Sequence, residues 1–310
     1  MNTHQQLSKA ELKRFTQKSD VKAAIILMAN YLIIAAAFAL AALWPSVITL
    51  LISTLLLGGR QLGLSILMHE CGHQLLFKHR KLNNLIGHWL IAVPLFLDMK
   101  SYAVGHFIHH RYAGTEKDPD LNNYKNFPIS RQSLLRKFWR DLSGQTGFRL
   151  IAAARKSQGN VMNSPDRDPD TLVSRANNTI RDGFIVNACL LIALTLAGSP
   201  WLYLLWVTAY FTFYMLFLRI RQIAEHAAVP DLFDLDPRQN TRTTYANIIE
   251  RLLVAPNRVN YHLEHHLLAS VPIYHLKAFH HHLLKLGVYK NTAIAPGYFS
   301  VLKNVTAPNI

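Results

Sequence analysis

The fold is decided by residues 23–67, which read AAIILMANYLIIAAAFALAAL (23–43), WPS (44–46) and VITLLISTLLLGGRQLGLSIL (47–67). Each apolar run is about 20 residues long, enough for a helix to cross a hydrocarbon layer of about 30 Å. The three residues between the runs leave room only for a tight turn. The stretch therefore predicts two membrane-spanning helices joined as a hairpin.

A second apolar pair lies further along the chain, at residues 183–197 and 201–218, and Gly198-Ser199-Pro200 separates its members. Both members are shorter than those of the first pair, but the connection is again too short for anything except a turn. The sequence therefore predicts four transmembrane helices arranged as two hairpins.

The charges predict the orientation of these helices. Neither turn carries a charge, and every lysine and arginine except Arg60 falls on the opposite side of the predicted spans, which the positive-inside rule assigns to the cytoplasm. We therefore expect an all-α integral membrane protein of the bacterial inner membrane, with both chain ends in the cytosol. Its single domain, residues 1–310, has a helical cytosolic cap formed by residues 68–182 and 219–310.

The formal net charge of +15 bears on the partners of the chain. No nucleic-acid recognition motif accompanies this charge, so topology and contact with anionic lipid headgroups explain the basic excess without nucleic acid. An acidic electron carrier or acyl carrier is a second partner that the charge would suit.

Four segments outside the predicted spans have patterns of their own. A basic helical arm is expected at Ser8–Lys22, ahead of a first span that acts as a signal anchor. The apolar stretch 85–97 is too short to cross a membrane and is expected to lie in the interface or to re-enter. Residues 129–142 have the pattern of a basic amphipathic helix, which suits a membrane surface and packing on its own domain equally well. Residues 163–170, with two prolines and three aspartates, predict a loop.

Eight of the sixteen histidines fall into three short clusters, HECGH (69–73), HFIHH (106–110) and HLEHH (262–266). Imidazole is the commonest neutral-nitrogen metal ligand, and spacings of three and four residues place side chains on one face of a helix. All three clusters lie on the predicted cytosolic side. Eight ligands exceed the needs of one zinc site, so the sequence favours two metal ions. These candidate ligands are His69, His73, His106, His109, His110, His262, His265 and His266.

Neighbouring polar residues extend the candidate site. His226 follows the last predicted span at the depth of the clusters and is a candidate ninth ligand. Gln222 lies one turn earlier, where it could reach a metal directly or through a water. Asp118, in the acidic run after the second cluster, and Glu225 are candidates to orient ligand imidazoles from outside, although a simple turn explains the acidic run equally well. The remaining histidines are interpreted as structural or solvated: His4, His79, His88, His275, His280, His281 and His282.

The first cluster alone leaves other functions open. HECGH is the His-Glu-x-x-His motif of zinc metalloproteases, in which Glu70 would be the general base, and intramembrane proteases place this motif on a membrane-embedded helix. A non-enzymatic metal carrier is a third interpretation. It is disfavoured because the ligands of a carrier would be expected to line a route across the membrane.

Three clusters of the forms HxxxH, HxxHH and HxxHH, interleaved with two transmembrane hairpins, resemble those of the membrane-bound fatty acid desaturase superfamily over roughly residues 20–290. The first and third clusters are most similar to those of desaturases that act on acyl chains of lipids. Acyl-CoA desaturases more often have four residues between the histidines of the first cluster. The resemblance implies a centre of two non-haem ferrous ions held by the eight cluster histidines and His226. It also implies that O2 is activated there and that hydrogen is removed from an unactivated C–H bond.

The resemblance leaves the outcome of the reaction open, because the same clusters serve desaturases, hydroxylases and ketolases. We expect an O2-dependent desaturase that introduces a double bond into a fatty acyl or related aliphatic chain of a membrane lipid. A hydroxylase or ketolase is the nearest rival. The sequence contains no CxxC, GxGxxG or haem-attachment motif. Electrons are therefore expected from a separate protein, either ferredoxin-like or cytochrome-like.

Overall fold

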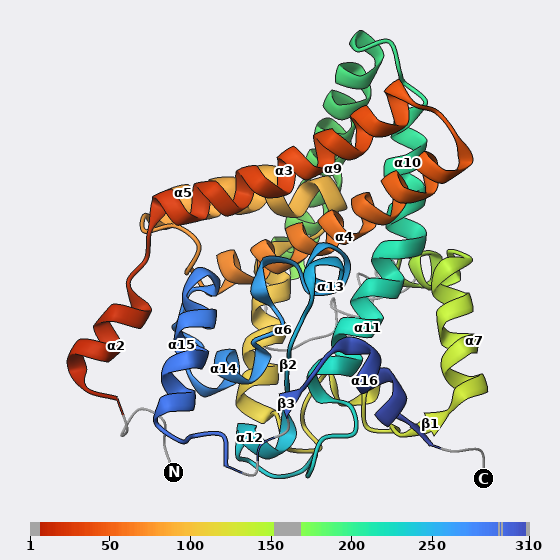
Figure 1. The fold of residues 1–310 in the computed structure, drawn as a ribbon. Helices are drawn as coiled ribbons and strands as arrows, with labels where there is room; N and C mark the ends of the chain where they lie inside the picture. Colours follow the sequence, from red (N-terminus) through yellow and green to blue (C-terminus); the bar gives the residue numbers. More distant parts are fainter. Residues whose placement is uncertain (1–6, 152–168, 291, 293, 308–310) are drawn as a thin grey trace.

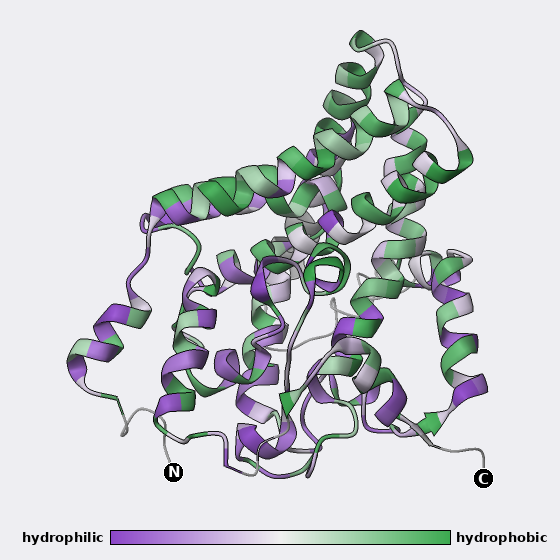
Figure 2. Ribbon diagram, in the orientation of Figure 1, coloured by the Kyte–Doolittle hydropathy of each residue, from purple (hydrophilic) through white to green (hydrophobic). Residues whose placement is uncertain are grey.

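The computed structural model describes residues 7–151, 169–290, 292 and 294–307, and helices account for most of them (Figure 1). Four runs among these residues are long and apolar enough to cross a membrane: Lys9–Leu43, Val47–Gly72, Asn177–Leu196 and Leu202–His226. Figure 2 shows hydrophobic residues concentrated where these runs lie, and hydrophilic residues concentrated in the remainder. The chain is therefore a mostly helical membrane protein with four candidate spans.

The first two candidate spans pack against each other. They are α3 (Asp20–Leu43), which follows a short helix within the first run, and α4 (Val47–Gly72). Small side chains such as Ala37 and Ala41 are fully buried on α3 and let the two helices approach closely. From Leu57 to its end, every residue of α4 is buried. The helical elements of the last candidate span and several shorter helices also contact α4, so this helix is the centre of the packing.

The second pair of candidate spans is formed by α9 (Pro169–Leu196) and by a continuous helical run. That run consists of α10 (Leu202–Ala209), η4 (Tyr210–Tyr214) and α11 (Met215–His226). Both spans are longer than the sequence predicted. The first six residues of the predicted loop 163–170 lie outside the described residues, and its last two begin α9.

The helix of the last span continues past Leu218, where the sequence predicted its end, because the charges that follow are paired inside the protein. The Nη2 atom of Arg219 donates a 2.7 Å hydrogen bond to Oδ1 of the buried Asp141. Arg221 Nε lies 2.6 Å from Oε1 of Glu225, one turn further along α11. The extension carries α11 as far as His226 and so determines where that side chain lies.

The apolar stretch 85–97 lies within a chain of short helices. α5 (Arg80–Ile86), η1 (Gly87–Ala92) and η2 (Val93–Leu95) are followed by α6 (Met99–Tyr112), after a bend of 93°. Only the two sides of the bend together have the length and apolarity of a span. η1 and α6 both pack against α4, so the bend brings the second histidine cluster toward the first. Re-entry of this stretch into the membrane stays a prediction.

Both predicted basic helices are present but shorter than expected. They are α2 (Lys9–Thr16) and α7 (Arg131–Leu142). On α7, Leu134 is buried, whereas Leu135 and Trp139 are exposed by 65% and 69%. The apolar face of this helix is therefore only partly used for packing, and its contact with a membrane surface stays a prediction.

Arg60 is the basic residue that the sequence placed inside a span, and it is buried in the protein. Its Nη1 donates a 3.3 Å hydrogen bond to Oδ1 of Asn30 on α3, and its Nη2 donates another of 3.3 Å to the carbonyl of Arg251. Protein groups thus bind both terminal nitrogens of the guanidinium, which is how a charge at such a depth is tolerated.

Most of the remaining elements lie with the polar part of the chain (Figure 2). Two short parallel pairs of strands, β1 with β4 and β2 with β3, tie distant segments together. Most of the helices here are one or two turns long. The elements are η3 (Leu121–Asn123), β1 (Ile129–Ser130), α12 (Pro237–Asn240), β2 (Thr243–Thr244), α13 (Ile248–Leu253), η5 (Pro256–Arg258), α14 (His262–Leu267), α15 (Ile273–Lys285), β3 (Ile294–Ala295), α16 (Tyr298–Asn304) and β4 (Thr306–Ala307).

Candidate metal centre

Four helices that are far apart in the sequence bring the nine candidate ligands together. α4 has His69 in its last turn and His73 at its C-cap. α6 carries the second cluster, α11 ends at His226, and α14 carries the third cluster. The imidazoles gather in two groups, and within each group one ring nitrogen per residue lies within 4.8 Å of the others. The five-histidine group is His69, His73, His106, His110 and His265; the four-histidine group is His109, His226, His262 and His266.

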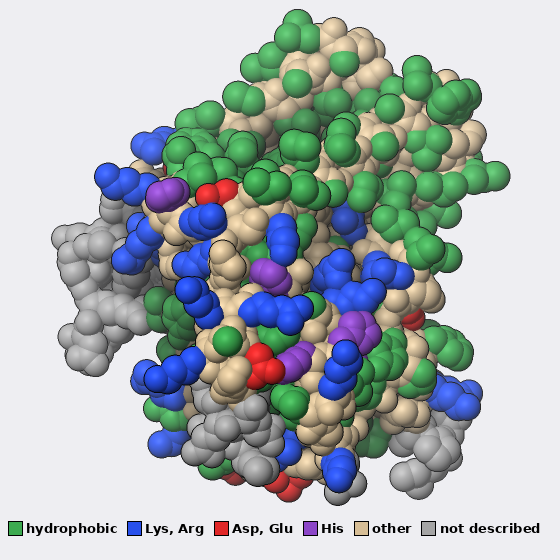
Figure 3. Space-filling model, turned by 60° about the vertical axis from the view of Figure 1, so that its left-hand side comes forward, with side chains coloured by type: hydrophobic (Ala, Val, Ile, Leu, Met, Phe, Trp, Pro, Cys, Tyr) green, Lys and Arg blue, Asp and Glu red, His purple; other side chains and the backbone are tan. Residues whose placement is uncertain are grey.

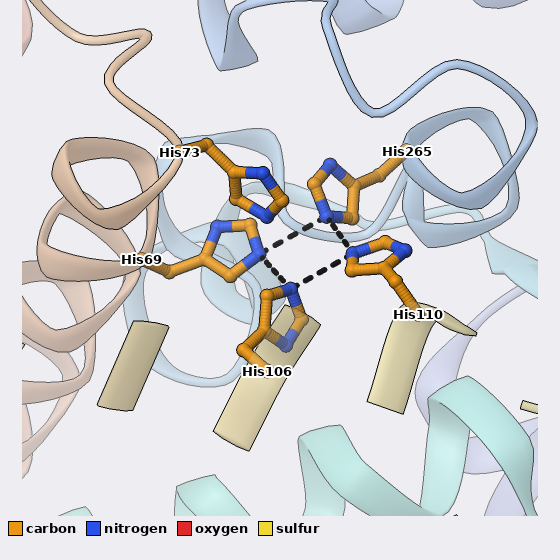
Figure 4. Close-up of side chains that lie close together, drawn as sticks. All are labelled: His69, His73, His106, His110 and His265. Atoms are coloured by element: carbon orange, nitrogen blue, oxygen red, sulfur yellow. Dashed lines mark hydrogen bonds between the residues drawn. The ribbon is translucent and has the colours of Figure 1, made fainter. Parts of the chain in front are cut away.

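The rings of the five-histidine group point toward one another (Figure 4). The Nε2 atom of His69 lies 2.8 Å from that of His106 and 3.0 Å from that of His265. The Nε2 atom of His110 lies 2.9 Å from each of the same two atoms. His73 completes the group, and its Nε2 is buried without a hydrogen-bond partner. A buried nitrogen of this kind needs a partner, and a metal ion would supply one.

The four-histidine group is adjacent and is built in the same way. The Nε2 atom of His262 lies 2.9 Å from that of His226 and 3.1 Å from that of His266. The ring of His109 lies 5.0 Å from that of His226, measured between centroids. The groups meet where the centroids of His110 and His266 are 4.5 Å apart. Two neighbouring nitrogen-rich sites are therefore present.

The outward-facing Nδ1 atoms of several of these rings have partners that fix the ring orientation. His109 Nδ1 donates a 2.9 Å hydrogen bond to Asp118, and His226 Nδ1 donates one of 3.0 Å to the carbonyl of Asn240. His262 Nδ1 lies 3.4 Å from Oε1 of Glu225. Such contacts hold the proton on Nδ1 and leave Nε2 free to bind a metal.

The chemistry of the donor set fits divalent metal ions. Burial, followed by the neighbouring imidazoles, lowers the pKa of His262, His265 and His266 well below the usual value. Burial also lowers the pKa of His73 to about 4. These rings are therefore neutral at physiological pH, which is the form that binds metals. Neutral nitrogen ligands suit iron, zinc, copper and nickel alike.

Two aromatic residues that were not predicted from the sequence lie against the histidine groups. Tyr124 donates a hydrogen bond from its hydroxyl to Asp118, and its ring is stacked on His226 with a centroid distance of 4.9 Å. Tyr102 is stacked on His106 at 5.6 Å. Tyr102 precedes the second cluster by one helical turn, a spacing that could have identified it. Tyr124 follows the cluster across a turn and has no such signal.

The carboxylate of Glu70 is not placed as a free base. Its Oε2 accepts a 3.0 Å hydrogen bond from the backbone N–H of Ile273, at the start of α15, and its Oε1 lies 3.3 Å from Nδ1 of His69. The residue is completely buried. This geometry gives Glu70 a role in joining α15 to the end of α4.

A cavity of about 690 Å³ lies beside both histidine groups. His106 of the five-histidine group and His109, His226 and His262 of the four-histidine group form part of its wall. Gln222 also lines the cavity but makes no hydrogen bond to a histidine of either group within the described part of the chain. Most of the remaining wall is apolar or aromatic, including Phe96, Phe184, Trp206, Tyr210, Tyr214 and Met215.

Three histidines outside the two groups have structural partners. His88 lies 2.8 Å from Asp182, and His282 lies 3.1 Å from Glu11. His280 is fully buried, and its Nδ1 donates a 2.6 Å hydrogen bond to Glu264. Glu264 therefore faces away from the ligand nitrogens, although it stands between two of the cluster histidines in the sequence.

Comparison of this sequence with known proteins identifies a family and two relatives. Residues 45–296 match the model of a family described as "Fatty acid desaturase". The chain is 28% identical over 268 residues to a dihydrorhizobitoxine desaturase of Bradyrhizobium elkanii, a match that covers 82% of this chain and 73% of the relative. It is also 27% identical over 122 residues to an "sn-1 acyl-lipid omega-3 desaturase (ferredoxin)" of Nostoc sp. (strain 36), covering 37% of this chain and 34% of the relative.

Proposed function

Because this chain belongs to the fatty acid desaturase family and is an oxidoreductase, we propose that it is an O2-dependent, di-iron membrane desaturase. It introduces a double bond into a fatty acyl or related aliphatic chain. The observation that carries the proposal is the position of the two histidine groups on the wall of one largely apolar cavity. A saturated chain in that cavity would lie directly beside both groups.

The five-histidine group would hold one ferrous ion and the four-histidine group the other. When bound, the two ions supply the activation of O2 and the removal of hydrogen from an unactivated C–H bond. The protein orients the imidazole ligands. Asp118, Glu225 and the Asn240 carbonyl hold three of the imidazoles by their Nδ1 atoms, and such contacts fix the orientation of ligand rings and raise their basicity.

The cavity determines what can approach the centre. Along the helical run from Tyr203 on α10 to His226 on α11, residues line the cavity at every turn or two, a length of about 34 Å at 1.5 Å per residue. Apolar walls bind an aliphatic chain by burying it and exclude water from the reacting carbon. The polar side chains of Arg221, Gln222 and Glu225 are confined to the part of this run nearest to His226.

We further propose that the four candidate spans form two hairpins in the bacterial inner membrane, with the polar layer and both histidine groups on the cytosolic side. The uncharged turns Trp44-Pro45-Ser46 and Gly198-Ser199-Pro200 support this orientation. A cytosolic site is accessible to a soluble electron donor and, through the cavity, to membrane lipid.

The zinc protease interpretation is not favoured, because Glu70 is completely buried and its Oε2 accepts a hydrogen bond from the backbone N–H of Ile273. A hydroxylase or ketolase of the same family has no specific support in the geometry. The lipid product and the metal content of the protein distinguish the desaturase from both of these alternatives.

The experiment is expression of the protein in a host with a simple lipid profile, followed by mass spectrometry of the lipids and metal analysis of the purified protein. We expect a new alkene and about two iron ions per chain. His265→Ala should abolish the product, whereas His281→Ala, at an exposed histidine outside both groups, should not. A hydroxyl or keto product would contradict desaturation, and one zinc per chain would contradict the di-iron centre.

A further inference from the structure

We propose that the surface formed by α13, η5 and α15 is the docking site of an acidic protein that donates single electrons. This inference rests on the proposed function, since that reaction needs electrons from outside. Each double bond formed consumes one O2 and yields two water molecules. The substrate gives two hydrogen atoms, the donor gives two electrons in two one-electron steps, and two protons come from the solvent.

Basic side chains outnumber acidic ones in the segment that forms this surface. Between residues 245 and 290 the only acidic side chains are Glu250 and Glu264. Glu264 is completely buried, and Glu250 accepts hydrogen bonds from the backbone N–H groups of Asn247 and Tyr298. Figure 3 shows lysine and arginine side chains outnumbering acidic ones below the hydrophobic zone on the side of the molecule that it turns forward. The basic residues of the segment are Arg251, Arg258, Lys277, Lys285 and Lys290.

We define the donor face as Tyr245, Arg251, Arg258 and Lys277, all of which are exposed. Arg251 lies on α13 and Arg258 on η5, and these two elements pack against each other. Lys277 lies on α15, and α15 packs against η5, which ends at Arg258. The face thus combines an aromatic residue with three cations, a composition that suits a small and transient contact with an acidic protein.

A chain of hydrogen bonds leads from the donor face to the candidate metal centre. Tyr245 is 40% exposed as a residue, and its hydroxyl lies 3.1 Å from Nε2 of His280. His280 Nδ1 donates a 2.6 Å hydrogen bond to Glu264. Glu264 lies on α14, next to His265 of the five-histidine group and two residues after His262 of the four-histidine group. Three side chains therefore connect the surface to the helix that serves both groups.

The proposed reaction gives no other role to Tyr245, His280 or Glu264. His280 and Glu264 are both completely buried, and neither lines the cavity that would hold the substrate. The acidic donor is favoured over anionic lipid as the occupant because lipid would explain the basic residues but not the buried connection from Tyr245 to α14. Ile248 and Ile249 on α13 are exposed by 71% and 67%, so lipid binding is retained as an outcome of the test.

The test compares charge reversals on two faces, using a reduced plant-type [2Fe–2S] ferredoxin as the probe. R251E/R258E alters the donor face, and R131E/R136E makes the matched change on α7. Ferredoxin binding to the full-length, iron-loaded protein is measured at low and high salt. We expect binding about tenfold weaker for R251E/R258E, binding close to wild type for R131E/R136E, and a weakening of wild-type binding by salt.

Turnover separates this inference from the proposed function. The ratio of the ferredoxin-driven rate to the dithionite-driven rate should fall about tenfold in R251E/R258E at low ferredoxin concentration. If the wild type makes no alkene with either reductant, the proposed function fails, but the binding result still decides the docking site. Equal ferredoxin binding by wild type and R251E/R258E would overturn the inference, as would a loss in R251E/R258E of binding to phosphatidylglycerol vesicles alone.

A second variant tests the hydrogen-bonded connection. Tyr245→Phe removes the hydroxyl that contacts His280 and leaves the charges intact. We expect kcat with saturating ferredoxin to fall while KM for ferredoxin stays at the wild-type value. An unchanged kcat would show that Tyr245 is not part of the connection to the metal centre. A raised KM with unchanged kcat would show that Tyr245 only contacts the donor.

Discussion

Asp118 is not among the nine candidate ligands, but it orients two histidines that are. Its Oδ1 accepts a hydrogen bond from His109, and its other oxygen accepts one from Tyr124, whose ring is stacked on His226. Burial raises the pKa of Asp118, but the hydrogen bonds from His109 and Tyr124 outweigh burial and lower it overall. The carboxylate is therefore ionised at neutral pH, and it orients two histidines of the same group.

The change Asp118→Asn tests this role. An amide is a weaker acceptor than a carboxylate and is free to turn its NH2 group toward His109, so we expect iron affinity to fall about 10- to 100-fold. Competition with a chelator measures the affinity. Glu116→Gln, an exposed change two residues away, is the matched control, and equal affinities in the two variants would show that Asp118 has no orienting role.

The assignment of His226 as a ninth ligand is also testable at the level of one residue. His226→Ala should lower the iron content from about two ions per chain to about one, because only the four-histidine group loses a ligand. The measurement is elemental analysis of the purified protein. His281→Ala should retain both ions. Retention of two tightly bound ions in His226→Ala would exclude His226 as a ligand.

At the scale of elements, the extension of α11 beyond Leu218 is the feature on which the four-histidine group depends. The extension places Arg219 where it pairs with the buried Asp141 of α7, 78 residues away in the sequence. Without this partner the helix would carry an unpaired arginine near the membrane boundary. α7 therefore helps to position His226 through a contact remote from the candidate metal centre.

We expect Arg219→Ala to destabilise the protein by about 2 kcal/mol or more, because it leaves the Asp141 carboxylate buried without its cation. Thermal unfolding in detergent should show a melting temperature lower by a few degrees. The exposed Arg136 of α7 provides the control, Arg136→Ala. If both variants melt at the same temperature, the ion pair is not what supports the extension.

Element boundaries were the part of the fold that the sequence could predict least. The apolar runs at 23–43 and 47–67 predicted α3 and α4 closely, because hydropathy alone determines them. The last span was predicted to end at Leu218, just before its first arginine, since no local pattern reveals a partner as distant as Asp141. Tertiary pairing extended the helix where local composition would have ended it.

At the scale of the whole molecule, the structure gathers all nine histidines that the sequence selected into one region. The sequence could not predict their division into five and four, because His109 and His110 are adjacent on α6 yet belong to different groups. The spacing within a cluster shows which side chains share a helix face. The crossing of four helices then decides which nitrogens share a site.

The proposed orientation in the membrane predicts which residues a reagent reaches. In a Cys189→Ser background, which removes the exposed native thiol, Ser199→Cys should react with a membrane-impermeant maleimide in intact cells. Ala278→Cys, on the proposed cytosolic side, should react only after permeabilisation. The reverse pattern of labelling would invert the topology.

The assembly of the candidate centre from α4, α6, α11 and α14 also links iron supply to the folding of the chain. Each ion would join segments that are distant in the sequence, so its binding free energy adds directly to the stability of the folded state. A free iron concentration 100 times the dissociation constant contributes about 2.7 kcal/mol per site. In an iron-starved cell the protein would therefore lose stability together with activity, and its abundance would follow the availability of the metal.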